Sequence, residues 1–447
     1  MKKTKLEKLI ENPPLVLGIS FAFIILVGAM LLNLPIASKN VESVGFINAL
    51  FTASSATCVT GLIVVNTAAH WTIFGKIVII TLIQIGGLGT MVVFSMLALI
   101  LKRKIGLKQR LLIKEQLNSD SLKGLVKLVK YVITVSFGIE LVGAILLSFR
   151  FIPMFGLKTG IAFSLFHSVS AFCNAGFDLL GSSLEPYYYD TLLNIVIMSL
   201  VIIGGLGFTV YLDIYNNKKW RKFNLHTKMV LIITAILLLL GTILFLAIEY
   251  NNPNTIGPMS FKDKLLASSF QSAIVRTAGF NSVSTASLND ATIFLLIILM
   301  FIGGSPASTA GGIKTTTFGV LLFSTISTLR GEKEAVVMKK TIPVATILKC
   351  LAIIFICILL VLAVALGLQI IEGDKFQFID ILFETVSAFA TVGITRGITS
   401  DFSTLSKIIL SVTMFLGRVG PTTLAIGIMK KRKVSNLKYS EGHIIVG

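Results

Sequence analysis

The chain has few charged residues for its length. Only 14% of its 447 residues are Asp, Glu, Lys or Arg, whereas 54% are hydrophobic. A soluble domain carries about 25% charged residues, so the composition excludes an ordinary soluble enzyme. Several apolar runs are about 20 residues long, which is the length that crosses a hydrocarbon core. We therefore expect a polytopic membrane protein.

Acidic residues and cysteines are also scarce. There are 21 Asp and Glu against 40 Lys and Arg, which gives a formal net charge of +19. In a membrane protein such an excess marks cytoplasmic loops and does not indicate binding of nucleic acid. The four cysteines lie in or beside apolar segments and lack the paired spacing of a zinc site or a disulfide framework. We interpret them as small buried residues.

The basic residues fall into five clusters, and these predict the topology. The clusters cover residues 1–14, 102–130, 218–228, 330–349 and 430–438. Two apolar stretches separate each cluster from the next, so the positive-inside bias predicts eight crossings of the plasma membrane with both termini in the cytoplasm. The expected crossings are residues 15–35, 73–101, 130–150, 191–214, 227–249, 291–329, 344–371 and 405–429.

Four similar segments lie between the paired crossings. They read FINALFTASSATCVTGL (46–62), IAFSLFHSVSAFCNAGF (161–177), LLASSFQSAIVRTAGFN (265–281) and IDILFETVSAFATVGIT (379–395). Each has a Phe and, ten residues later, a Gly, except that the third segment has nine from Phe270 to Gly279. A fixed internal period indicates repeated units. Their apolar cores are too short to cross a bilayer, which suggests re-entrant helices.

A glycine cluster follows each segment in the next crossing. The clusters are IGGLG (85–89), IGGLG (203–207), IGGSP (302–306) and LGRVG (416–420). We predict an all-α integral membrane fold with four pseudo-symmetric helix–pore-loop–helix repeats, made of eight transmembrane and four re-entrant pore helices around one central pore. Because each repeat starts and ends inside, the axis lies along the membrane normal. The repeats are 1–130 with a cytoplasmic linker, 131–225, 226–340 with a broken second helix, and 341–447 with a C-terminal tail.

Four irregular backbone stretches around one axis suit a cation path. Exposed backbone at membrane depth is tolerated where it lines such a path, and carbonyl oxygens can replace the hydration shell of a cation. The C-terminal ends of the short helices would favour positive charge. The candidate ion-binding residues are Val59, Thr60, Gly61, Asn174, Ala175, Gly176, Thr277, Ala278, Gly279, Thr391, Val392 and Gly393.

These four triplets, with RTAGFNS (276–282) and LGRVGPTTL (416–424), resemble the filter loops and last crossing of the Trk/Ktr/HKT potassium transporters, and in particular the Ktr-type membrane subunit. The resemblance spans essentially the whole chain. It implies potassium uptake through a selectivity filter, with Gly61 and its three counterparts favouring potassium over sodium. It further implies a homodimer with one pore per protomer, a cytosolic nucleotide-binding regulatory ring on the basic face, sodium as an activator and no covalent cofactor. The tail 439–447 is expected at the dimer interface.

The sixth crossing is interrupted. The run 291–302 would span about 18 Å as a helix, and a polar stretch follows it. A cytoplasmic linker would leave both flanking pieces too short to cross, so we interpret the stretch as an intramembrane loop, which the resemblance makes a gate. GGIKT (311–315) lacks the adjacent Gly-Lys pair of a phosphate-binding loop. The gate candidates are Gly303, Gly304, Ser305, Pro306, Ala307, Ser308, Thr309, Ala310, Gly311, Gly312, Lys314 and Arg418.

Three basic residues are expected at membrane depth, where charges usually face a cavity or a partner. Arg418 is expected to bond carbonyls of the loop, or alternatively to pair with a carboxylate such as Glu384. Arg276 is expected to brace the filter rather than to touch ions. Lys314 either belongs to the gate or extends to the cytoplasmic interface.

Two other classes of function remain open. A secondary carrier would bind a solute at broken helices, although such carriers are usually built from inverted repeats and these units share one orientation. A membrane enzyme would need a catalytic constellation, and no Ser/His, His/Asp or Asp/Asp set at helical spacing occurs at membrane depth. We interpret His167 and Glu140 as buried structural groups.

Overall fold

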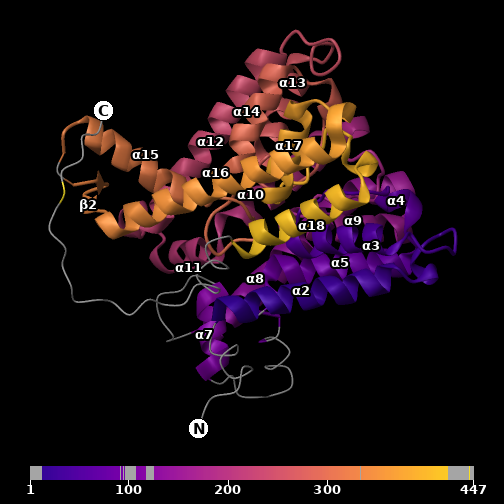
Figure 1. The fold of residues 1–447 in the computed structure, drawn as a ribbon, viewed down its shortest axis with the longest axis horizontal. Helices are drawn as coiled ribbons and strands as arrows, with labels where there is room; N and C mark the ends of the chain where they lie inside the picture. The colour runs from indigo at the N-terminus through magenta and orange to yellow at the C-terminus, as the bar shows by residue number, and fades with distance from the viewer. Residues whose placement is uncertain are drawn as a thin grey trace.

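The computed structural model describes residues 13–90, 92–93, 95, 107–116, 125–332, 334–420 and 442 (Figure 1). The part within 1–130 contains α2 (Pro13–Leu32), η1 (Pro35–Ala37), α3 (Phe46–Cys58), α4 (Thr67–His70), α5 (Ile73–Leu88) and α7 (Leu107–Gln116). The next part contains α8 (Leu125–Phe155), α9 (Leu157–Phe172), η2 (Glu185–Tyr187), α10 (Thr191–Leu206), α11 (Phe208–Asn217) and η3 (Trp220–Lys222).

The second half of the chain repeats this order. It begins with α12 (Leu225–Glu249), α13 (Phe261–Ile274), η4 (Thr285–Ser287), α14 (Asp290–Phe301) and α15 (Thr315–Leu329). A short hairpin of β1 (Val336–Val337) and β2 (Lys340–Thr341) follows, with Val336 opposite Thr341. The last elements are α16 (Val344–Glu372), η5 (Gly373–Lys375), α17 (Phe378–Phe389), η6 (Thr399–Asp401) and α18 (Thr404–Val419).

Side-chain caps fix where several of these helices begin. Thr72 accepts a hydrogen bond from Gly75 N before α5, and Asp190 accepts one from Leu193 N before α10. Ser260 before α13 and Ser403 before α18 do the same. Such caps satisfy amide groups that have no partner inside the helix, so the sequence itself sets these starts.

Four helices in the described part are long and apolar enough to cross a membrane. The segments are Leu15–Leu32, Val126–Phe155, Leu225–Glu249 and Val344–Lys375. The pair α10 and α11, bent by 89°, raises the number to five if it counts as one span. Shorter apolar helices are Ile73–Leu88, Asp290–Phe301 and Thr315–Leu329. Eight crossings therefore stay a prediction.

In three of the predicted crossings a helix ends at a glycine. The expected spans 73–101, 191–214 and 405–429 correspond to helices that stop at Leu88, Leu206 and Val419. The next residue has positive φ in each case: 87° at Gly89, 96° at Gly207 and 92° at Gly420. Glycine adopts this conformation without a steric penalty and so ends the helix. A helix end at a glycine cluster is thus found in these three crossings as well as in the interrupted sixth.

Four short helices, α3, α9, α13 and α17, pack in a cyclic pattern. Each contacts the long helix that precedes it: α2, α8, α12 and α16, respectively. Each also contacts the final helix of the unit before it, so that α9 packs on α5, α13 on α10, α17 on α14 and α3 on α18. Figure 1 shows the last of these contacts, with the yellow α18 beside the indigo α3. These contacts arrange the four short helices in a closed ring, which the contact between α18 and α3 completes.

The periodic phenylalanines lie inside this ring. Phe51, Phe270 and Phe383 are fully buried and Phe166 is 6% exposed. The spacing from Phe to Gly therefore reflects a common packing anchor for each short helix.

Candidate functional site

The four triplets share one backbone conformation. Their glycines have positive φ: 100° at Gly61, 70° at Gly176, 74° at Gly279 and 87° at Gly393. The first residue of each triplet is also left-handed, with φ of 57° at Val59, 60° at Asn174, 75° at Thr277 and 53° at Thr391. A left-handed non-glycine residue is uncommon, so its fourfold recurrence indicates a shared structural requirement. The triplet residues are buried except Gly279, which is partly exposed.

The glycines face one another. A Cβ added to Gly61 would lie 2.6 Å from Ala175 O and 3.3 Å from the Cα atoms of Gly176 and Gly393. One added to Gly176 would lie 2.6 Å from Gly279 Cα. One added to Gly393 would lie 2.8 Å from Gly61 Cα. Since residues from all four quarters of the chain meet here without side chains between them, the site is a ring of backbone.

The third loop departs from the others in the way its spacing predicts. Thr60 N, Ala175 N and Val392 N each donate to a carbonyl five residues earlier, at 2.8, 2.7 and 2.8 Å. Ala278 N instead donates to Ile274 O, four residues earlier, at 2.9 Å. This tighter turn accounts for the spacing from Phe270 to Gly279, which is one residue shorter than in the other loops. The fourfold symmetry of the ring is therefore approximate.

The glycine clusters allow close approach of helices to the ends of the short helices. A Cβ on Gly86, Gly204 or Gly417 would collide with the carbonyl of Thr57, Phe172 or Phe389, respectively. A Cβ on Gly303 would collide instead with Gly311 O of the following loop. The third unit therefore places its own loop where the other units place the end of a short helix.

Residues 303–314 form a loop that is bonded to the second unit. Ser305 N donates to Gly205 O at 3.0 Å, and Phe208 N donates to Ala307 O at 2.9 Å. Thr309 Oγ1 donates to Phe172 O at 3.2 Å and lies 3.3 Å from the side-chain amide of Asn174. The loop thus contacts a triplet residue directly.

The other side of this loop contacts the fourth triplet. A Cβ on Gly311 would collide with Thr391 Oγ1, and one on Gly312 would lie 3.2 Å from Ala390 Cβ. The ends of the loop are held together by pairing of Ile302 with Ile313. Ser305 Oγ also lies 3.0 Å from Thr315 Oγ1. These contacts place the loop directly against two of the four triplets.

Arg418 joins the loop to the first unit. Its Nη1 donates to Thr309 O, and its Nη2 donates to Gly86 O at 2.5 Å and Gly87 O at 3.3 Å. Glu384, the partner considered from the sequence, is bonded elsewhere, and Arg418 contacts no carboxylate among the described residues. The guanidinium therefore crosslinks carbonyls of two separate segments.

The other two basic residues behave differently. Lys314 donates from Nζ to Ala310 O at 2.8 Å, so it folds back on its own loop and does not extend to an interface. Arg276 donates from Nη2 to Thr234 Oγ1 at 3.4 Å, and no triplet residue accepts from its side chain in the described part. Glu140 accepts from Gln84 Nε2 at 3.0 and 3.2 Å, and His167 Nε2 accepts from Leu179 N at 3.3 Å, as expected for structural groups.

Sequence reasoning missed a network outside the fourth triplet. Arg396 Nε lies 2.9 Å from Asp380 Oδ1, and its Nη1 donates to Thr285 O at 2.6 Å. Glu384 accepts from Arg396 N and Thr399 Oγ1, both at 2.9 Å. This network ties the third and fourth loops together. The sequence does contain an Arg three residues after Gly393 and two acidic residues on the preceding helix, which could have suggested an ion pair. It does not indicate which of the two carboxylates pairs with Arg396.

Long apolar helices around four converging loops define a polytopic helical membrane protein. The chain belongs to the TrkH cation transport protein family, whose description matches residues 18–437. It is 44% identical over 448 residues to the Ktr system potassium uptake protein B of Bacillus subtilis, covering 100% of both chains. It is 42% identical over 451 residues to the potassium/sodium uptake protein NtpJ of Enterococcus hirae, covering 100% of this chain and 99% of that protein.

The fold is also that of a solved transporter. The structure of the potassium transporter TrkH from Vibrio parahaemolyticus superposes with a TM-score of 0.73. It is 19% identical and covers 94% of this chain, with 85% of that chain matched. At this identity the likeness defines the fold of a membrane protein, and no residue roles follow from it.

Proposed function

We propose that this chain takes up potassium ions across the plasma membrane, with the four triplets as its selectivity filter. The observation that carries the proposal is the ring of four glycines with positive φ, one from each quarter of the chain. Backbone carbonyls in such a ring can replace the hydration shell of a potassium ion. The names of the relatives, potassium uptake protein and potassium/sodium uptake protein, agree with this substrate.

We further propose that α3, α9, α13 and α17 are re-entrant pore helices within four repeats, 1–130, 131–225, 226–340 and 341–447. With eight crossings, these repeats surround one pore. The cyclic packing of the short helices supports this arrangement. Their carboxyl ends meet at the triplets, where their partial negative charge favours a cation.

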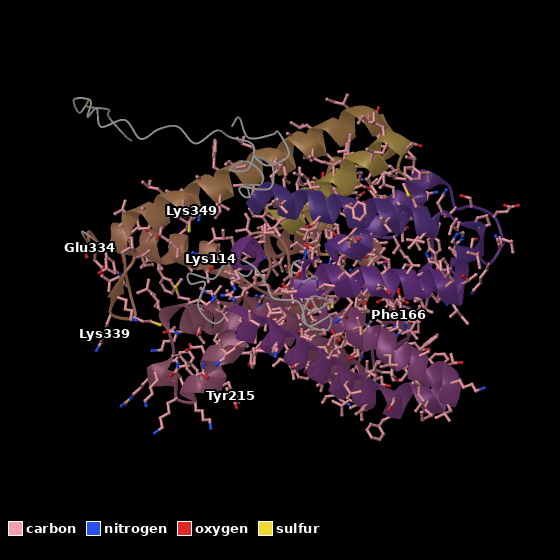
Figure 2. The ribbon with its side chains drawn as sticks, turned by 90° about the horizontal axis from the view of Figure 1, so that it is seen from below. Lys114, Phe166, Tyr215, Glu334, Lys339 and Lys349 are labelled. Atoms are coloured by element: carbon pink, nitrogen blue, oxygen red, sulfur yellow. The ribbon has the colours of Figure 1, made fainter. Side chains whose placement is uncertain are left out.

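Both termini are proposed to be cytoplasmic. Figure 2 shows Lys114, Lys339 and Lys349 toward the same end of the molecule relative to Phe166 of α9. A concentration of basic residues on one side is typical of the cytoplasmic face.

The loop 303–314 is the proposed gate, and Arg418 is the residue that holds it closed. The loop contacts Asn174, Thr391, Arg418 and the carbonyls of Gly204 and Gly205, and these contacts support this role because the loop can leave its position only by breaking them. Residues 303–312, together with Lys314 and Arg418, form the gate in this proposal.

The regulation that we propose involves a partner. The relatives include a component of a Ktr system, which supports a multi-subunit assembly. We propose a homodimer with a cytosolic nucleotide-binding ring on the basic face, and sodium as an activator. The tail 439–447, expected at the dimer interface, lies outside the described residues apart from Gly442.

Ion flux into proteoliposomes tests the proposal. Purified protein, with sodium and its cytosolic partner present, should admit potassium and rubidium down their gradients without any organic solute, and should pass sodium much less. Vesicles prepared with the Gly393→Ala variant serve as a control, because a Cβ at Gly393 would collide with Thr60 O. Cation flux that requires a co-transported solute, or none in the wild type, would contradict a conducting filter and favour a carrier.

A further inference from the structure

Arg276 is a buried cation without a counter-charge. Its side chain is 8% exposed, and Nη2 has one long hydrogen bond of 3.4 Å to Thr234 Oγ1. Its Nε is buried and has no partner. By contrast, Arg396 faces Asp380 and Arg418 donates to three carbonyls. Within the described residues, Arg276 belongs to no ion pair.

A small cavity adjoins this guanidinium. It is lined by Val201, Ile202 and Gly205 of α10, Ala273 of α13, Gly304 of the gate loop, and Arg276 itself. Its volume is about 10 Å³, which is room for one particle the size of a water molecule or a halide. A Cβ added at Gly205 would have only the side-chain amide of Asn174 nearby, at 3.7 Å, which agrees with open space there.

The position of Arg276 makes its charge consequential. It directly precedes Thr277, the first residue of the third triplet, whereas the equivalent positions in the other loops hold Cys58, Cys173 and Ala390. The carboxyl end of α13 supplies only about half of a negative charge. The part of the Arg276 charge that the helix end does not offset would repel a cation held by the adjacent triplet.

We propose that this cavity binds a small monovalent anion, chloride in physiological salt, which neutralises Arg276 beside the third triplet. A guanidinium offers only donors, so its partner must accept. Water could accept, but it would leave the charge of Arg276 uncompensated. A halide accepts from the guanidinium and neutralises its charge.

The consequence for transport rests on the proposed conduction of potassium. With the anion bound, the third loop is close to neutral and accepts a cation. Without it, an uncompensated charge near the ion path disfavours occupancy, so we expect potassium flux to fall at least about tenfold when gluconate replaces chloride. The Arg276→Gln variant lacks the charge, and its flux should not respond to the exchange.

Anomalous diffraction from the full-length protein in bromide tests the site without any transport measurement. Bromide should give a peak between Arg276 and Gly205. The Gly205→Ala variant should fold normally and lose the peak, because its Cβ occupies the cavity. The control Gly138→Ala, where a Cβ meets nothing within 4 Å, should keep it.

The outcomes separate the two proposals. No bromide peak at the cavity, or a peak that survives Gly205→Ala, overturns the anion site even if potassium flux is robust. A bromide peak in a protein that carries no potassium retains the anion site and overturns the proposed function instead. If Arg276→Gln does not fold, Gly205→Ala provides the same test of flux, because it should abolish the response to chloride.

Discussion

Replacing Arg418 with Gln tests the gate most sharply. The guanidinium donates to Thr309 O in the loop and to Gly86 O and Gly87 O in the first unit. A hydrogen bond from a charged group contributes roughly 1.5–3 kcal/mol. Loss of the bond to Thr309 should therefore shift the loop toward its displaced state by about 10- to 100-fold, since each 1.4 kcal/mol is about a factor of ten.

The fold should survive this change. Arg418 has no carboxylate partner among the described residues, so Gln leaves no buried counter-charge unpaired. The bonds from Ser305 N to Gly205 O and from Thr309 N to Gly204 O remain to position the loop. We expect rubidium uptake per folded protein to rise about tenfold or more, while loss of the bonds to Gly86 O and Gly87 O lowers the melting temperature without preventing folding.

Lys314→Gln is the matched control for this experiment. It removes the same charge from the same region, but Lys314 Nζ donates only to Ala310 O within the loop. Because this bond does not tie the loop to another segment, uptake should rise far less than in Arg418→Gln. An Arg418→Gln variant that melts at a lower temperature and conducts no better would refute the reasoning, and equal gains in both variants would attribute the effect to charge alone.

Three further changes follow from the same contacts. Gly61→Ser should lower the ratio of potassium to sodium uptake, because its Cβ would lie 2.6 Å from Ala175 O. Gly45→Ser is the control, since Gly45 also has positive φ (85°) but a Cβ there meets nothing within 4 Å. Equal uptake ratios in the two variants would remove Gly61 from the filter. Deleting residues 305–312 should raise uptake per inserted protein, because it removes the proposed gate. The deletion should be tolerated, since Ile302 and Ile313 pair and hold the two ends of the loop close together. Reduced insertion and uptake would indicate a structural linker. Arg396→Gln should lower the melting temperature and the preference for potassium over sodium, because the contacts of Arg396 with Asp380 and Thr285 O contribute roughly 1.5–3 kcal/mol each. An unchanged ion preference would mean that Arg396 stabilises the fold but does not shape the filter.

The spacing from Phe to Gly in the sequence has a counterpart in the local structure. In each of the four units, the segment from Phe to Gly contains a buried phenylalanine, a short helix and a left-handed turn. The nine-residue spacing from Phe270 corresponds to the tighter turn at Ala278. These features depend on local chain geometry. A repeated local pattern is therefore enough to predict them.

Other features depend on contacts that hydropathy does not contain. The ends of α5, α10 and α18 follow from φ at Gly89, Gly207 and Gly420, while the residues on either side stay apolar and read as a continuous span. Glu384 could have met Arg418 or Arg396, and only packing of the fourth loop on η4 decides between them. Charge partners far apart in sequence are set by the tertiary fold.

Anomalous scattering from rubidium is the most direct test of the central claim. Crystals of the protein grown with rubidium in place of potassium should show density on the axis between Gly61, Gly176, Gly279 and Gly393, within reach of the triplet carbonyls. The density should weaken when sodium replaces rubidium. Rubidium density elsewhere in the protein, with none between the four glycines, would contradict a filter built from these loops.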